Sequence, residues 1–282
     1  MKLLRFGPKG AEKPGMLDAA GKIRDLSAHV SDFAGETVSN AAIDRLRGID
    51  PESLPLVDGA SRIGSCVAST PTFHCVGLNY VRHAKETGMD APTEPILFNK
   101  AATALSGPFD PVIRPKDSQK LDYEVELGIV IGDVVEHVSE AEALSKVAGY
   151  CVINDVSERE FQAERLGQWV KGKSAPSFGP TGPWLVTADE VPDPQKLGCW
   201  LKVNGETRQD SNTDDMIFSA AHIVSYMSRF MRLVPGDLIA TGTPEGVAMG
   251  MKPQKWLVPG DEVTVGIDGL GEQRQSVVAF PG

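Results

Sequence analysis

The clearest alternation of apolar and polar positions lies between residues 122 and 131, which read Asp-Tyr-Glu-Val-Glu-Leu-Gly-Ile-Val-Ile. Side chains on a β-strand point to opposite faces in turn, so this pattern predicts a strand with one apolar face and one acidic face. The apolar face holds Tyr123, Val125, Leu127, Ile129 and Ile131. The acidic face holds Asp122, Glu124 and Glu126.

The acidic face admits two interpretations. A charged, solvated face is common on strands, and Glu-x-Glu alone is a weak signal. Glutamate is however depleted in strands, and the run ends in an apolar Ile-Val-Ile that is typical of a buried strand. A second apolar run, 148–153, ends in Asn154-Asp155, which places another carboxylate at a strand end. Acids of both segments would give three oxygen ligands without Cys or His, a set that favours Mg²⁺ or Mn²⁺.

The rest of the pattern predicts a chain that mixes strands and short helices. Residues 1–68 read as a small β-rich domain, and a boundary near Ser69 separates it from a larger domain over 69–282. The larger domain is expected to contain strands or hairpin arms at 73–78, 95–100, 201–203, 206–209, 236–241 and 259–267, and helices at 79–88, 141–147, 158–169 and 217–231. Asn204-Gly205 predicts a tight hairpin turn, and 171–184 a long Pro/Gly-rich loop.

Composition limits the kinds of partner that the chain is expected to bind. With 282 residues and 41% hydrophobic residues, the chain can bury a large core. Its net charge of -10 argues against nucleic acid or an anionic membrane as a partner. The four cysteines lie far apart, which predicts reduced core thiols rather than a zinc site or disulfides. No segment reads as a signal peptide or a membrane span, so we expect a cytoplasmic protein.

Several residues are candidates for chemistry, each with a plainer alternative. His83 and Glu86 share a helix face, either as a surface hydrogen bond or as a general base oriented by a carboxylate. Lys100, at a strand end, is either a surface lysine or a substrate contact. A desolvated lysine in the 171–184 loop could stabilise a developing enolate. The 241–244 loop, Thr-Gly-Thr-Pro, is either a simple turn or a carboxylate-binding loop.

Taken together, these motifs resemble the fumarylacetoacetate hydrolase family over about residues 73–270. The segments that carry the resemblance are Gly77-Leu78-Asn79-Tyr80, His83-Ala84-Lys85-Glu86, Asp122-Tyr123-Glu124-Val125-Glu126-Leu127, Asn154-Asp155-Val156-Ser157, Lys171-Gly172-Lys173-Ser174, Gly182-Pro183-Trp184 and Thr241-Gly242-Thr243-Pro244. The opening, Leu3-Leu4-Arg5-Phe6-Gly7-Pro8-Lys9-Gly10 with Arg24-Asp25-Leu26-Ser27-Ala28-His29, is similar to the bacterial members that cleave diketo-deoxy sugar acids of the fuconate and rhamnonate pathways.

The resemblance implies an α+β fold with a mixed β-roll catalytic domain, usually in a homodimer. It also implies roles for individual residues. Mg²⁺ or Mn²⁺ would be held by Glu124, Glu126 and Asp155; the catalytic residues would be His83, Glu86 and Lys173; and the substrate contacts would be Thr243, Lys100 and Tyr80. One departure is that Ala175-Pro176-Ser177 stands where family members often have Phe-Asp-Thr.

The predicted function is metal-dependent hydrolysis of a carbon-carbon bond in a 2,4-dioxo, acylpyruvate-like acid, giving pyruvate and a hydroxy acid. The similarity of the opening residues implies a 2,4-diketo-3-deoxy sugar acid as that substrate. His83 would activate water, while the metal and Lys173 would stabilise the enolate. Decarboxylation or isomerisation of a 2-oxo acid would use the same metal-bound enolate and remains an alternative. A sugar-acid binding protein without turnover is a second alternative, although such a protein would not need the His83–Glu86 pair.

Overall fold

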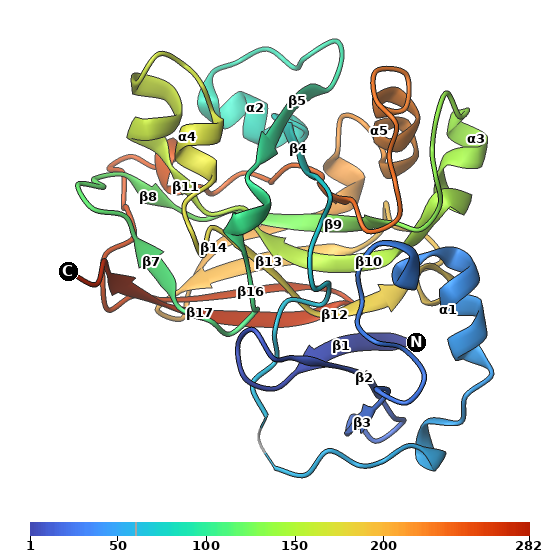
Figure 1. The fold of residues 1–282 in the computed structure, drawn as a ribbon. Helices are drawn as coiled ribbons and strands as arrows, with labels where there is room; N and C mark the ends of the chain where they lie inside the picture. Colours follow the sequence, from blue (N-terminus) through green and yellow to red (C-terminus); the bar gives the residue numbers. More distant parts are fainter. Residues whose placement is uncertain (60) are drawn as a thin grey trace.

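The computed structural model describes residues 1–59 and 61–282, and it has the predicted α+β fold, with two main sheets and few short helices (Figure 1). The first sheet has the strand order β3 (Ile23–Asp25), β2 (Lys13–Leu17), β1 (Lys2–Phe6), β12 (Gly179–Thr187), β10 (Val147–Asn154), β9 (Val125–Ile131), β15 (Leu238–Ala240), β4 (Phe73–Gly77) and β5 (Ile96–Lys100), and β6 (Leu105–Ser106) pairs with β12. The second sheet has the order β14 (Glu206–Asn212), β13 (Gly198–Val203), β16 (Glu262–Ile267), β17 (Gly271–Ala279) and β7 (Val112–Arg114). A short pair joins β8 (Leu121–Asp122) to β11 (Ser157–Glu158).

The helices are short and lie in the connections between strands. They are α1 (Asn40–Arg47), α2 (Val81–Thr87), α3 (Glu140–Ala143), α4 (Val170–Lys173) and α5 (Ala220–Met227), together with a π-helical turn at Glu160–Glu164. Helices α2 and α4 lie on the same side of the sheets, near strands β4 and β5 (Figure 1). This is the region in which the candidate site is found.

Strand β9 runs through the middle of the molecule and is buried along its whole length. Its odd-numbered residues, such as Leu127 and Ile129, pack in one core with residues of the second sheet, including Leu201 and Val265. Val130 points to a second core, which it shares with other residues of the first sheet and with residues of α1. The predicted alternation is therefore confirmed, but both faces of the strand are covered by protein.

The predicted continuous run from residue 122 is interrupted. Asp122 ends the separate strand β8, and β9 begins at Val125. The Asp122 carboxylate accepts hydrogen bonds from the backbone of Ala248 at 2.8 Å and from Arg159 Nε at 2.8 Å. Its oxygens are thus held by the protein, and Arg159 connects it to the next acid of the run, Glu124.

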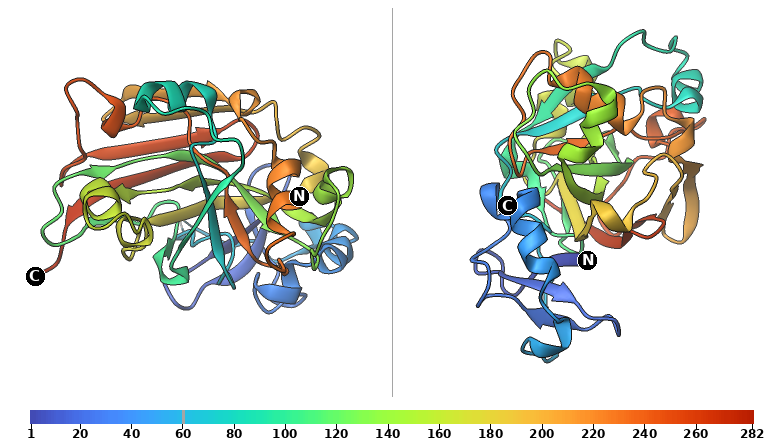
Figure 2. Two further views of the ribbon diagram at one scale, coloured as in Figure 1. Left: turned by 90° about the horizontal axis from the view of Figure 1, so that it is seen from above. Right: turned by 90° about the vertical axis from the view of Figure 1, so that its right-hand side faces the viewer.

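The N-terminal strands extend the first sheet. Strand β1 pairs antiparallel with β12, with Leu3 opposite Leu185, and β2 and β3 continue outward from it. In Figure 2 these strands form a lobe on one side of the molecule. The proposed boundary near residue 68 stays a prediction, since sharing a sheet does not decide whether the segment folds alone.

Several local predictions are confirmed and others are corrected. The hairpin turn has the positive φ angles of 51° at Asn204 and 79° at Gly205 that such a tight turn requires. Helix α2 ends at Gly88, which has the expected left-handed conformation. The helix predicted over 158–169 is instead β11 and the π-helical turn, and the loop predicted over 171–184 contains most of α4 and the beginning of β12. Helix 217–231 is shortened to α5.

The cysteines and the membrane prediction can also be compared with the structure. All four cysteines are buried and free, as predicted. Across residues 1–59 and 61–282, no helix has both the length and the apolar character needed to cross a membrane.

Candidate metal centre and active site

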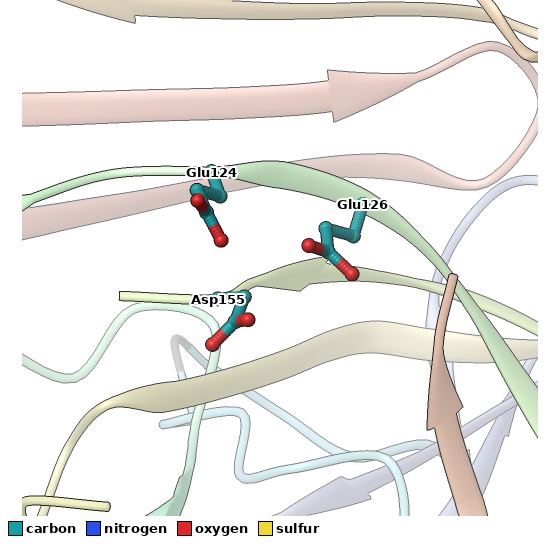
Figure 3. Close-up of side chains that lie close together, drawn as sticks. All are labelled: Glu124, Glu126 and Asp155. Atoms are coloured by element: carbon teal, nitrogen blue, oxygen red, sulfur yellow. The ribbon is translucent and has the colours of Figure 1, made fainter. Parts of the chain in front are cut away.

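Antiparallel pairing of β9 with β10 brings three predicted metal ligands together. Val125 pairs with Asn154 and Glu126 with Ile153, so Glu124 and Asp155 form the next pair, and Asp155 N donates to Glu124 O at 2.9 Å. One oxygen from each of Glu124, Glu126 and Asp155 lies within 4.8 Å of the other two. The three side chains lie close together in Figure 3. The pairing register of two strands thus builds a site that needs no long loop.

Cations surround these acids. Lys173 Nζ donates to Glu124 at 2.6 Å and to Asp155 at 2.7 Å, and Lys100 Nζ pairs with the other oxygen of Asp155. Arg159 donates to Glu124 at 2.5 Å and to Asp122. Burial raises the pKa of Glu124, but the charges of Arg159 and Lys173 outweigh burial and lower it to about 2. Burial lowers the pKa of the Lys173 ammonium, but the neighbouring carboxylates raise it overall.

Glu126 differs from its neighbours. Its Oε2 accepts a hydrogen bond from Gly242 N at 2.8 Å, but it forms no salt bridge among the described residues. Burial, and then the charges of Asp155 and Glu124, raise the pKa of Glu126 well above its usual value. A buried carboxylate without a cation, next to two others, is the arrangement that a divalent ion stabilises. The donor set therefore fits Mg²⁺ or Mn²⁺.

The π-helical turn and α4 hold the cations in place by close backbone packing. A Cβ at Gly172 would lie 2.4 Å from Glu158 O and 2.5 Å from Gln162 N, so only glycine allows α4 to approach the turn this closely. This contact directs the next residue, Lys173, into the acids. The turn itself supplies Arg159 and Gln162, and π-helical segments frequently occur at functional sites.

Helix α2 places His83 and Glu86 beside the acids. The Nδ1 atom of His83 is 3.4 Å from Glu86 Oε2, a long contact, and His83 is 5% exposed. Both carboxylate oxygens of Glu86 also accept from Gly246 N, at 3.0 and 3.2 Å. Glu86 thus ties α2 to the loop after β15 and fixes the position of the imidazole.

A cavity of about 240 Å³ lies between His83 and the glutamates of the acidic cluster. It is lined by His83, Glu124, Glu126, Arg159, Gln162, Lys173, Thr243, Gly77 and a group of apolar side chains: Val76, Leu78, Met89, Phe98, Ala163, Trp169 and Met249. Met89 and Met249 also line a more open hollow of about 670 Å³ formed by residues 86–89 and 249–254. They therefore stand where the inner cavity meets its outer mouth.

The remaining predicted site residues occupy different positions. Thr243 lines the cavity, but its hydroxyl donates to Val125 O at 3.0 Å and accepts from Gln209 Nε2 at 2.9 Å. Lys100 lies behind the acids on Asp155, outside the cavity lining. Tyr80 is buried beside Cys199 and does not line the cavity either. Substrate contact by these three residues stays a prediction.

Sequence reasoning missed several residues that line the cavity. Arg159 and Gln162 lie in a segment for which the sequence predicts an ordinary helix. Polar side chains are common on such a helix, so they give no signal of a site. Phe98 and Trp169 are apolar residues of a kind that more often fills a core. The family departure at 175–177 lies outside the cavity lining, and Ser177 Oγ accepts a hydrogen bond from Ile113 N at 2.8 Å. That departure supports β7 rather than the site.

Comparison with known proteins identifies the family and the fold of this chain. Residues 72–278 match the model of the family described as fumarylacetoacetate (FAA) hydrolase, C-terminal. A putative hydrolase of Burkholderia cenocepacia is 58% identical over 277 residues, which cover 98% of each chain. The solved fumarylacetoacetate hydrolase of Exiguobacterium antarcticum superposes with a TM-score of 0.86 at 37% identity, covering 99% of this chain and 100% of that one. A probable 2-hydroxyhepta-2,4-diene-1,7-dioate isomerase of Mycobacterium abscessus has a TM-score of 0.85 at 30% identity, with 100% of both chains covered.

Proposed function

Because the chain belongs to the fumarylacetoacetate hydrolase family, we propose that it is a metal-dependent hydrolase that cleaves a carbon-carbon bond in a 2,4-dioxo acid. The observation that carries the proposal is the cavity lined by Glu124, Glu126, Lys173 and His83, with Asp155 next to the two glutamates and Glu86 next to the imidazole. The products would be pyruvate and a second carboxylic acid.

The charges of the site support a bound dication and an anionic substrate. Four buried carboxylates, those of Asp122, Glu124, Glu126 and Asp155, are matched by three cations, those of Lys100, Arg159 and Lys173. With all four carboxylates ionised, the cluster carries one excess negative charge, and a divalent ion changes this to one excess positive charge. An excess positive charge in a buried site attracts the carboxylate of a 2-oxo acid. The ion, when bound, would also polarise the 2-oxo acid group.

The chain's own residues provide the acid-base steps. His83, held by Glu86, takes a proton from water as the water oxygen bonds to C4 of the substrate. The C3–C4 bond then breaks, its electron pair stays on C3, and the acyl fragment leaves as a carboxylic acid. The Lys173 ammonium, held at the acids by Glu124 and Asp155, stabilises the enolate of pyruvate until C3 takes the proton that His83 removed from water. The apolar walls limit the access of other water molecules.

Isomerisation is the second candidate, because one structural relative is named as a probable isomerase. An isomerase, like a decarboxylase, uses an enolate but adds no water to the substrate. A binding protein without turnover would give no product at all. These reactions share the metal site, so products decide among them.

The test is turnover of 2,4-dioxopentanoate in water enriched with ¹⁸O, with and without Mg²⁺ or Mn²⁺. Hydrolysis yields pyruvate and acetate, with the new label in the acetate carboxylate. Release of CO₂ without labelled acetate would favour a decarboxylase, and faster interconversion of the keto and enol forms of the acid, without acetate or CO₂, would favour an isomerase. The homodimer also stays a proposal, which sedimentation velocity at micromolar concentration tests.

A further inference from the structure

The inner cavity is divided between a charged end and an apolar end. The charged end consists of the acids with Lys173 and Arg159, described above. The remaining wall is formed largely by carbon and sulfur, from Phe98 on β5, Trp169 at the start of α4, and Met89 and Met249 at the mouth. The cavity is also small, since pockets for drug-sized ligands have about 300–1,000 Å³.

The apolar wall begins next to the reacting groups. Lys173 Nζ lies 5.3 Å from the centre of the Phe98 ring. The Phe98 ring in turn packs edge-on against Trp169, with ring centres 5.2 Å apart. Gly77 allows this packing, because a Cβ there would lie 2.5 Å from the Trp169 ring. These aromatic side chains are thus fixed by their neighbours and form a rigid wall.

Few polar groups along this wall are free to bind hydroxyl groups. The Thr243 hydroxyl already donates to Val125 O and accepts from Gln209. Gln162 Oε1 accepts a hydrogen bond from Arg159 Nη1 at 3.0 Å. The amide NH₂ group of Gln162 is therefore the part that can still bind a substrate hydroxyl. A chain with several hydroxyls would leave most of them unpaired against apolar side chains, which is unfavourable.

We infer that the acyl group of the substrate is apolar, either a short alkyl chain or an aryl ring, and not the polyhydroxylated chain of a sugar acid. The inference rests on the proposed function for the reacting end and concerns only the far end of the substrate. It replaces the diketo-deoxy sugar acid that the opening residues of the sequence suggested. The aromatic pair and the two methionines determine the specificity.

The experiment compares three 2,4-dioxo acids in the metal-loaded protein. In these acids C4 carries a methyl group, a propyl group, or a propyl group with a hydroxyl on each carbon. The propyl acid should have a kcat/KM at least about 10-fold above that of its hydroxylated counterpart, because hydrophobic pockets discriminate by about 10-fold to 200-fold. Equal or faster cleavage of the hydroxylated acid would overturn the inference while leaving the proposed hydrolysis intact.

A binding measurement separates this inference from the reaction. Calorimetry would compare 2-oxoheptanoate with its 5,6,7-trihydroxy form, neither of which has the C4 carbonyl that hydrolysis requires. Tighter binding of 2-oxoheptanoate, by about 10-fold, supports an apolar subsite even if none of the dioxo acids is cleaved. In that case the proposed hydrolysis fails by itself. Equal or weaker binding of 2-oxoheptanoate overturns the inference.

Variants locate the effect in the wall. Met249→Gln and Met89→Gln keep the side-chain size while placing an amide at the mouth, so each should lower the preference for the propyl acid several-fold. Leu166→Gln is the matched control, because Leu166 is 95% exposed, lies in the same connection as Trp169 and does not line the cavity. It should keep the full preference. An unchanged ratio in both folded methionine variants would contradict the assignment.

Discussion

Replacing Glu126 by glutamine should have opposite effects on the protein with and without metal. Ligand oxygens of Glu124, Glu126 and Asp155 lie within 4.8 Å of one another. Two unit charges at that distance interact by about 3.5 kcal/mol at an effective dielectric constant of 20. Glutamine removes this repulsion, while its carbonyl oxygen can still accept the hydrogen bond from Gly242 N. Nearby cations offset part of the gain, so we expect the metal-free variant to be more stable by about 1–3 kcal/mol.

The metal-loaded protein should respond in the other direction. At a concentration of 100 times Kd, an ion stabilises the folded protein by about 2.7 kcal/mol. If the loss of one ligand weakens binding about 100-fold, the same concentration stabilises the variant by only about 0.4 kcal/mol. Each kcal/mol corresponds to about 2–4 °C in Tm for a chain of this size.

The assay is thermal unfolding of both proteins in chelator and across a titration of Mg²⁺ or Mn²⁺. The exposed Glu272 on β17 provides the control substitution, Glu272→Gln, which should change neither quantity. An equal metal-dependent rise in Tm for Glu126→Gln and the unaltered protein would remove Glu126 from the ligand set. A large loss of stability in chelator would show that the repulsion does not govern this cluster.

Three further predictions concern other parts of the molecule. His83→Ala should slow hydrolysis of 2,4-dioxopentanoate by about 10² to 10⁴-fold, and calorimetry should find metal affinity nearly unchanged, since His83 is not a proposed ligand. Burial lowers the pKa of His74 from 6.5 to about 4. Between pH 7 and 4.5 the unfolded chain therefore binds more protons at this residue, and His74 by itself should lower the free energy of unfolding by about 2–3 kcal/mol. Urea unfolding of His74→Gln should show a smaller loss over the same pH range, and an equal loss would assign the effect to other groups. Gly172→Ala should lower both Tm and activity, because the new methyl group would collide with backbone atoms. Gly48→Ala is the control and should leave both within error, because a Cβ there would lie 3.9 Å from the nearest atom, Arg45 O.

Local patterns were predictable where local chemistry determines them. The alternation along 123–127 follows from the two faces of a strand, one of which packs in a core while the other carries Glu124 and Glu126. Asn204-Gly205 follows from the positive φ angles of a tight hairpin. The end of α2 at Gly88 has the same cause. In each case the residues that carry the signal are also the residues that adopt the structure.

Other features depend on partners that the sequence does not identify. Nothing within 158–169 indicates that Arg159 pairs with acids more than thirty positions earlier, yet this pairing accompanies a π-helical turn where a regular helix was expected. Phe98 and Trp169 are residue types that usually pack in a core. They line a cavity here because their neighbours leave a space beside them. Tertiary contacts decide such features, so periodicity alone could not predict them.

The pairing of β9 with β10 has a consequence for insertions and deletions. A one-residue change in length within either strand would turn every later side chain to the opposite face, and Glu124 and Asp155 would no longer meet. At the apolar end of the cavity, Met89, Trp169 and Met249 lie instead in connections between strands, which tolerate changes in length far better. Length variation should therefore alter the accepted acyl group long before it alters the metal ligands. A scaffold divided in this way can exchange substrates without rebuilding its chemistry.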